Sequence, residues 1–267
     1  ISRRSDVPFG IKKGIVYSKG DVAAMFSREG SATWAYNWHA KPDAPMFQQI
    51  PMFWAPSTVW DRENIDDVMA RVREGAPWVL GYNEPDMTRW WGCGTEPKDA
   101  YDTWGKDMFS FYTEGAKLVC PGITSWNSTA GATGGASGLV WLREFVGYAA
   151  APTDLLCSAQ AVHWYGLDND GKSGTEKAYD FMAYVGQAHA EINELFGYEM
   201  PLWITEFAPA PHYDAEMMAE FLDVALPWLD QQDYVHRYSP WMADAMVVGQ
   251  QLNVAGEKFV TWRGSQQ

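Results

Sequence analysis

Two glutamates that each follow an apolar run are the residues of this chain best suited to chemistry. Glu84 follows the mostly apolar segment 78–82, and Glu206 follows the apolar segment 202–204. Burying a carboxylate is costly unless a partner neutralises it or a reaction uses it. Two carboxyl groups hydrolyse a sugar acetal when one protonates the leaving oxygen and the other attacks the anomeric carbon or activates water. The two segments therefore predict the paired carboxyl groups of a glycosidase.

A purely structural role for the two glutamates is the alternative. Glu84 would then cap a turn with Pro85, and Glu206 would form a buried ion pair. A buried ion pair requires a close lysine or arginine to offset the loss of water around the carboxylate. Neither segment contains one, and the nearest cation to Glu84 along the chain is Arg89. The sequence therefore favours the catalytic interpretation.

Short β-like runs alternate with amphipathic helical stretches along the chain, which is the order typical of a parallel sheet. Eight runs are predicted strands: residues 14–18, 32–38, 49–54, 78–82, 117–120, 158–164, 202–205 and 235–239. Polar caps and helical periodicity predict helices at residues 62–74, 99–114, 139–149, 175–196 and 214–230. This order predicts an α/β fold, a (β/α)8 barrel, that forms a single catalytic domain over residues 1–267.

An open doubly wound sheet is the alternative architecture, and it carries a glycine-rich phosphate-binding turn after an early strand. The glycine-rich segment of this chain, residues 131–138, follows the fifth predicted strand instead. It has no acidic residue placed to hold a ribose, so we interpret it as a mobile loop. The barrel remains the predicted architecture.

The carboxyl ends of all the strands of such a barrel meet at one face, which brings the segments after strands four and seven together. In this setting the chain resembles the retaining clan A glycoside hydrolases. It is most similar to glycoside hydrolase family 128, whose members act on β-1,3-glucan. The resemblance rests on two motifs, Gly81-Tyr82-Asn83-Glu84-Pro85-Asp86 and Trp203-Ile204-Thr205-Glu206-Phe207.

The resemblance implies a double displacement through a covalent glucosyl-enzyme. Glu84 would be the acid/base and Glu206 the nucleophile, with their carboxyl groups roughly 5 to 5.5 Å apart. Asn83 would hydrogen-bond the 2-hydroxyl of the sugar. The resemblance also implies an aromatic hydroxyl on the nucleophile after the sixth strand, and we expect Tyr165 to provide it, with His163 alongside.

One part of the family pattern has no counterpart in this chain. The clan often carries an arginine on an early strand, where it supports the nucleophile, and no arginine here clearly matches it. Part of the support of Glu206 is therefore left unassigned by the sequence.

Tryptophan is frequent, with 15 residues in the chain. Its flat ring packs against the C–H face of a pyranose, so tryptophans at or beyond strand ends are candidate sugar platforms. They are Trp38, Trp54, Trp90, Trp91, Trp126, Trp164 and Trp241. Trp241, two residues past the eighth predicted strand, lies where the resemblance implies an aromatic ring beneath the sugar. Asn37, beside Trp38, is predicted to bind substrate, with a role in a capped loop as the alternative.

The composition limits the partners of this protein. A net charge of −14 disfavours nucleic acid and anionic lipid, and no apolar run is long enough to cross a bilayer. We expect β-1,3-glucan as the partner, with no nucleic acid and no membrane. No cofactor and no metal are expected, because the acidic segment 168–171 lacks the spacing of a calcium-binding loop.

The three cysteines permit at most one disulfide bond. Cys120 and Cys157 lie in apolar, strand-like runs, which favours buried thiols. A disulfide bond that involves Cys93 stays open.

These features together predict an endo-acting β-1,3-glucanase that works with retention. We expect a monomer that is secreted, with a leader peptide removed before residue 1. Two alternatives stay open: a barrel that binds β-glucan without cleaving it, and a retaining hydrolase of another β-linked glycan such as β-1,4-glucan or mannan.

Overall fold

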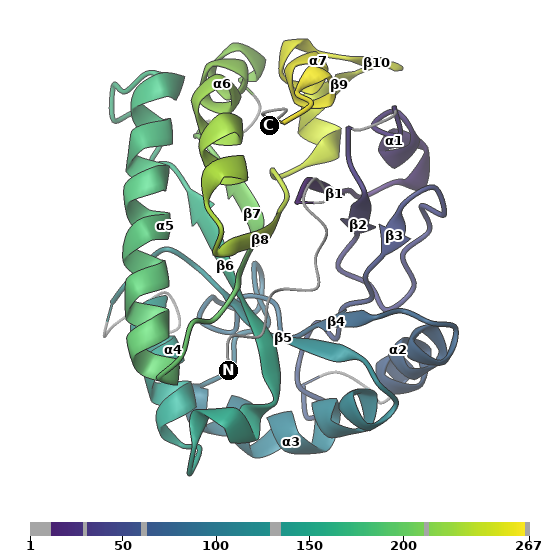
Figure 1. Ribbon diagram of the computed structural model, residues 1–267, viewed down its shortest axis with the longest axis vertical. Helices are drawn as coiled ribbons and strands as arrows, with labels where there is room; N and C mark the ends of the chain where they lie inside the picture. Colours follow the sequence, from purple (N-terminus) through teal and green to yellow (C-terminus); the bar gives the residue numbers. More distant parts are fainter. Residues whose placement is uncertain (1–11, 29–30, 60–62, 129–134, 211–213, 265–267) are drawn as a thin grey trace.

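The computed structural model describes residues 12–28, 31–59, 63–128, 135–210 and 214–264 of the chain. These residues form a single mixed α/β domain in which the helices lie outside the strands (Figure 1). The parallel strands are β1 (Gly14–Val16), β2 (Trp34–Tyr36), β3 (Gln48–Gln49), β4 (Trp78–Leu80), β5 (Lys117–Ile123), β6 (Cys157–Tyr165), β7 (Leu202–Ala208) and β8 (Val235–Tyr238). The helices are α1 (Gly20–Ala24), α2 (Glu63–Arg73), α3 (Pro97–Thr113), α4 (Leu139–Gly147), α5 (Gly174–Phe196), α6 (Ala215–Gln231) and α7 (Val254–Thr261).

The strands form two parallel sheets. One contains β1, β2 and β3, and the other contains β4 to β8 in sequence order. Isolated parallel bridges join the edges of the two sheets, between Met52 and Leu80 on one side and between Lys13 and Tyr238 on the other. The predicted α/β class with parallel strands in sequence order is thereby confirmed.

The sequence explains where α5 begins and ends and where α6 begins. Ser173 caps α5 by accepting a hydrogen bond from the backbone of Glu176, whose side chain in turn accepts one from the backbone N–H of Ser173. Gly197, with φ of 74°, ends α5 in the left-handed conformation that glycine adopts at low cost. Asp214 caps α6 through backbone N–H groups of its first turn.

Apolar residues fill two layers. One cluster packs the helices against the outside of the sheets, and Phe181, Phe207 and Phe221 meet there. The other cluster lies among the strands, where the ring of Trp203 is 5.5 Å from that of Trp34 and 4.8 Å from that of Trp78. These two layers leave the carboxyl ends of the strands free to present polar side chains above a packed interior.

Some predicted element bounds are wrong. Pairing in β2 and β3 covers less than predicted, whereas β5 and β7 continue to Ile123 and Ala208. Glu206 therefore lies within β7 rather than after it. Short elements without a clear period were missed, namely α1, the 3₁₀ helices Pro152–Leu155 and Ala243–Met246, the β9–β10 hairpin (Val247–Val248 and Gln251–Leu252) and α7.

The interpretation of Cys120 and Cys157 as free thiols is wrong. They form a disulfide bond between the neighbouring strands β5 and β6, with 5.4 Å between their Cα atoms. They are 37 positions apart in sequence, and only the parallel pairing of the two strands brings them together. Cys93 is a buried free thiol.

Two further segments can be placed. Residues 131–134 of the predicted glycine-rich loop lie outside the described residues. In the acidic segment, Asp170 accepts a hydrogen bond from Lys177 at 2.8 Å, as expected of a charged turn.

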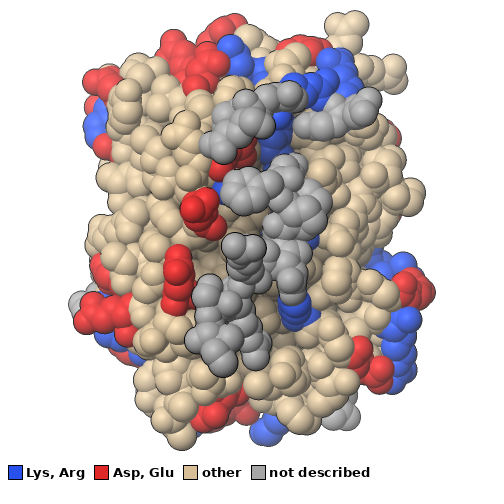
Figure 2. Space-filling view, viewed as in Figure 1, with Lys and Arg blue, Asp and Glu red and all other residues tan. Residues whose placement is uncertain are grey.

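The charged side chains agree with the acidic composition. Figure 2 shows Asp and Glu spread along the left side and upper edge of one face, with Lys and Arg in separate smaller groups. Among the described helices, none has both the length and the apolar character that a membrane span requires.

Candidate active site

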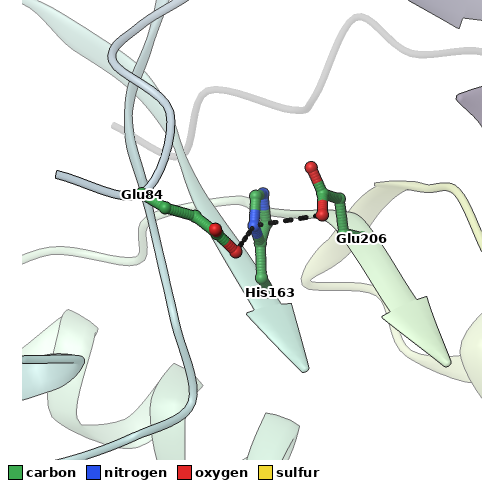
Figure 3. A group of neighbouring side chains, drawn as sticks. All are labelled: Glu84, His163 and Glu206. Atoms are coloured by element: carbon green, nitrogen blue, oxygen red, sulfur yellow. Dashed lines mark hydrogen bonds and ion pairs between the residues drawn. The ribbon is translucent and has the colours of Figure 1, made fainter. Parts of the chain in front are cut away.

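The structure brings Glu84, His163 and Glu206 together, with the histidine ring between the two carboxylates (Figure 3). His163 Nδ1 lies 2.8 Å from Oε1 of Glu84 and 3.6 Å from Oε2 of Glu206. One oxygen of each carboxylate and a ring nitrogen of the histidine all lie within 4.8 Å of one another. All three side chains are buried. The two glutamates singled out in the sequence therefore face each other across a short gap.

The pairing of β6 with β7 positions two of these residues. His163 is the register partner of Glu206, and side chains of paired residues in neighbouring parallel strands point to the same side of a sheet. Tyr165, two residues along β6, points to that side as well. The local strand register thus places both donors beside the Glu206 carboxylate.

Glu84 is positioned by its backbone rather than by strand register. Its backbone N–H donates to the carbonyl of Gly122, and its φ is 44°. A residue other than glycine rarely adopts a positive φ, and such residues gather at functional sites, where the surrounding structure compensates for the strain. A Cβ atom at Gly122 would lie 3.0 Å from Nε2 of His163. Glycine at this position therefore lets β5 pass close beneath the histidine ring.

Several donors orient the carboxylate of Glu206. The hydroxyl of Tyr165 donates to Oε2, and the indole N–H of Trp38 donates to Oε1 at 2.8 Å. The hydroxyl of Tyr36 lies 3.4 Å from Oε1 and 2.9 Å from the carbonyl oxygen of Thr205. Hydrogen bonds to an ionised group are the strong ones, so this carboxylate is fixed in one orientation.

The electrostatics of the group change the pKa of Glu84 and of His163. Burial raises the pKa of Glu84 to about 7, the hydrogen bond and charge of His163 lower it in part, and the charges of Glu206 and Asp86 add to the rise. Burial by itself lowers the pKa of His163, but the charge of Glu206, together with the hydrogen bond and charge of Glu84, outweighs burial and raises this pKa to about 9. A carboxyl with a pKa near 7 can deliver a proton near neutral pH.

The same three side chains are of types that bind metal ions. A metal-bound histidine must be neutral, because the metal takes the lone pair of a ring nitrogen. Both ring nitrogens of His163 already have hydrogen-bond partners, Nδ1 with Oε1 of Glu84 and Nε2, at 2.8 Å, with Oγ1 of Thr205, so a metal ion would have to displace one of them. The cluster therefore suits a hydrogen-bonded acid/base pair better than a metal ion.

Asn83, next to Glu84, carries an unpaired polar atom. Its side chain is 4% exposed, and its Oδ1 has no hydrogen-bond partner among the described residues. Its backbone is fully engaged, with its N–H on the carbonyl of Trp54 and its carbonyl on the N–H of Cys93. Leaving a buried acceptor unpaired costs about 1 to 3 kcal/mol, so a ligand hydroxyl is the natural partner for this oxygen.

Two of the predicted tryptophans, Trp38 and Trp241, contact Glu206 or its partner Tyr165. Trp38 uses its indole N–H on Glu206, a role that differs from the predicted platform. Trp241 is half-buried and presents its ring edge to Tyr165, with 5.9 Å between ring centroids. Trp54 is half-buried and packs against both apolar clusters. Trp126 is 46% exposed in the loop after β5.

One predicted binding residue points away from the carboxylates, and another is hydrogen-bonded within its own loop. Trp164 alternates with His163 and Tyr165 along β6, so its ring packs outward between sheet and helices, stacked on Phe221. The prediction that Trp164 binds substrate is therefore wrong. Asn37 accepts a hydrogen bond from the backbone N–H of His39 two residues on, as in the capped-loop alternative, and its role in substrate binding stays a prediction.

Three residues near the carboxylates were missed in the sequence. Tyr36 and Thr205 lie in predicted strands, and their direction depends on register, which the sequence does not give. Asp86 is fully buried and accepts hydrogen bonds from Thr124 and from the backbone of Gly138. Its signal was present as a second acidic residue two positions after Glu84.

Two facing carboxyl groups are the arrangement with which most glycoside hydrolases cleave their substrates. The chain belongs to the glycosyl hydrolase catalytic core family, whose model matches residues 14–262. The resemblance to glycoside hydrolase family 128 is confirmed by this match and by the similar structures.

The similar structures are β-1,3-glucanases of family 128. The chain is 27% identical to a curdlan-specific exo-β-1,3-glucanase of subgroup III from Blastomyces gilchristii, with 96% of this chain and 100% of that one covered and a TM-score of 0.80. It shares the fold of a subgroup II endo-β-1,3-glucanase from Sorangium cellulosum, with 21% identity, coverage of 94% and 98%, and a TM-score of 0.73.

One curated protein is also similar. Alkali-sensitive linkage protein 1 of Schizosaccharomyces pombe (strain 972 / ATCC 24843) is 28% identical over 185 residues. The match covers 67% of this chain but 29% of that protein, so this chain spans less than a third of its length.

Proposed function

We propose that this protein hydrolyses β-1,3-glucan with retention of anomeric configuration. Glu84 is the acid/base and Glu206 the nucleophile. The observation that carries the proposal is that an oxygen of each carboxylate lies within 4.8 Å of the other. Whole carboxyl groups lie roughly 5 to 5.5 Å apart in retaining enzymes and roughly 6.5 to 9.5 Å apart in inverting enzymes, which admit a water molecule between them; two single oxygens in such close approach favour the shorter separation.

The proposed reaction has two displacements. Glu206 attacks the anomeric carbon while Glu84 gives its proton to the glycosidic oxygen, so that the leaving sugar departs and a glucosyl-enzyme ester forms. Glu84, now ionised, takes a proton from water, and the water oxygen attacks the same carbon and releases Glu206. The proton lost in the first step is thereby regained.

The neighbouring residues support these steps. Tyr165 and Trp38 hold Glu206 in line for attack, and His163 orients Glu84. The unpaired Oδ1 of Asn83 accepts a hydrogen bond from the sugar 2-hydroxyl, which strengthens as the oxocarbenium-like transition state forms.

The residues of the mechanism come from both sheets, since Trp38 follows β2 of the three-stranded sheet and Glu206 lies in β7 of the five-stranded one. We infer that the two sheets form one (β/α)8 barrel, with the parallel bridges Lys13–Tyr238 and Met52–Leu80 as its closing contacts. We expect the chain to act as a monomer with a neutral polymer, β-1,3-glucan, as its partner. The Cys120–Cys157 disulfide bond supports a secreted protein, because such bonds persist in oxidising compartments.

The preference for β-1,3 linkages is supported by the similar exo-β-1,3-glucanase at 27% identity. Endo action is the mode that we propose, and the similar proteins include endo and exo enzymes. Product analysis on laminarin and curdlan distinguishes the two modes. A ladder of oligosaccharides is expected for endo action, whereas release of a single short product would replace it with exo action.

The decisive experiment follows hydrolysis of a laminari-oligosaccharide by NMR. The first product with a free anomeric centre is expected to be the β-anomer, and early α-anomer would contradict retention. Binding of the sugar without cleavage would favour a non-hydrolytic glucan-binding protein. Cleavage of β-1,4-glucan or mannan instead would assign another substrate to the same carboxyl pair.

A further inference from the structure

Three exposed tryptophans lie in the loops that follow β4 and β5. Trp90 is 93% exposed, Trp91 77% and Trp126 46%. Nearly all the other described tryptophans are buried or half-buried. Single exposed apolar side chains are common, but several large exposed rings in neighbouring loops are a candidate binding surface.

The loop that carries Trp90 and Trp91 is attached to the backbone of the proposed acid/base. The N–H of Cys93 donates to the carbonyl of Asn83 at 2.9 Å, and the N–H of Thr95 donates to that of Pro85 at 2.8 Å. A Cβ atom at position 92 would lie 2.1 Å from the carbonyl oxygen of Glu84, so only glycine fits there. The residue after Trp91 thus rests directly on Glu84.

Asp86 links the loop after β5 to the segment after β4 by hydrogen bonds. Its carboxylate accepts hydrogen bonds from Thr124, at the start of the loop after β5, and from the N–H of Gly138 at its end. Within this loop the hydroxyl of Ser137 donates to the carbonyl of Trp126. The three tryptophans therefore lie in two hydrogen-bonded loops beside Glu84.

The mechanism determines which part of a bound glucan chain these two loops would contact. The acid/base protonates the leaving oxygen, so the sugars that depart lie on the Glu84 side, whereas the nucleophile bonds to the sugar that stays. We propose that Trp90, Trp91 and Trp126 form a platform that binds the leaving-group portion of a β-glucan chain. This inference rests on the proposed function and adds a substrate-binding surface to it.

The chemistry of the surface fits a neutral polysaccharide. Indole rings pack against the C–H faces of glucose units without requiring charge on the ligand. An anionic lipid surface would need a basic patch, and the net charge of the chain is −14. A polymer that extends past the cleavage point therefore matches both the rings and their position.

The test compares two substrates of the same enzyme. The double variant Trp90→Ala/Trp91→Ala and the variant Trp126→Ala are assayed on curdlan, and on an aryl β-laminaribioside whose leaving group contains no sugar. We expect kcat/KM on curdlan to fall by at least about tenfold in the double variant, equal to about 1.4 kcal/mol, and by less in Trp126→Ala. Activity on the aryl glycoside is expected to change by less than about twofold, because that substrate has no leaving sugars to bind.

A matched control and a binding measurement complete the test. Phe109 and Tyr112, 55% and 45% exposed on the outside of α3, are replaced by alanine, and this variant should keep its activity on both substrates. Binding to insoluble curdlan is measured by co-sedimentation in a Glu206→Gln background. It should weaken when Trp90 and Trp91 are also replaced by alanine.

Two outcomes would overturn the platform. One is unchanged activity on curdlan, and the other is an equal loss on both substrates, which indicates a structural role for the loop. If the unaltered protein cleaves no β-glucan at all, the proposed function fails instead, so the two failures are distinguishable.

Discussion

The indole nitrogen of Trp38 lies 2.8 Å from Oε1 of Glu206. Trp38 follows β2 by two residues and has a φ of 62°, so the chain turns there in a conformation that is rare for a tryptophan. The clan that the chain resembles often supports its nucleophile with an arginine, for which this sequence has no clear match. An indole donates a hydrogen bond without adding a positive charge, so the negative charge of Glu206 is left to act on Glu84. The raised pKa of Glu84 depends in part on that charge.

Removal of either carboxyl group should allow azide to replace its function, and the two variants should form azide products of opposite anomeric configuration. Glu84→Ala and Glu206→Ala are each expected to lose about 10³-fold or more in kcat on laminarin. With azide and an activated aryl glycoside, Glu84→Ala should form a β-glycosyl azide, because azide enters the glucosyl-enzyme. Glu206→Ala should form the α-azide, because azide replaces the nucleophile. NMR identifies the products, and the same anomer from both variants would refute the assigned roles.

The contributions of the donors Trp38 and Tyr36 to catalysis by Glu206 can be measured separately. Trp38→Phe removes a hydrogen bond to a charged group worth about 1.5 to 3 kcal/mol, so kcat/KM should fall by roughly tenfold to hundredfold. Tyr36→Phe should cost less, because its hydroxyl lies 3.4 Å from the carboxylate and closer to the carbonyl of Thr205. Steady-state kinetics on an aryl glycoside would show the order, and a larger loss in Tyr36→Phe would contradict it.

The pH profile should report the environment of Glu84. The acid must be protonated, so kcat/KM is expected to fall as the pH rises through about 7. The hydrogen bond and charge of His163 lower this pKa, so their removal in His163→Gln should raise it and move the alkaline limb to higher pH. His189→Gln, on the outer helix α5, serves as the control and should leave the limb in place. A limb that moves to lower pH in His163→Gln would contradict the assignment.

The sequence predicted the parallel α/β order and the segments of both glutamates, because an apolar run that ends in a carboxylate is a local signal. It missed what depends on register. The outward direction of Trp164, the donor role of Tyr36 and the Cys120–Cys157 bond all follow from which residues of neighbouring strands lie side by side. Side chains alternate along a strand, so a shift of one residue reverses such assignments.

The Cys120–Cys157 disulfide bond should stabilise the domain without taking part in chemistry. Closing a chain segment of 37 residues lowers the entropy of the unfolded state, which corresponds to about 4 kcal/mol of added stability. The variant Cys120→Ser/Cys157→Ser should therefore unfold at a markedly lower temperature, measured by calorimetry, with its kcat on laminarin retained at temperatures where it stays folded. A reductant should lower the Tm of the unaltered protein and leave that of the double variant unchanged. An equal effect of reductant on both proteins would mean that the stabilisation arises elsewhere, since Cys93 remains a thiol in each.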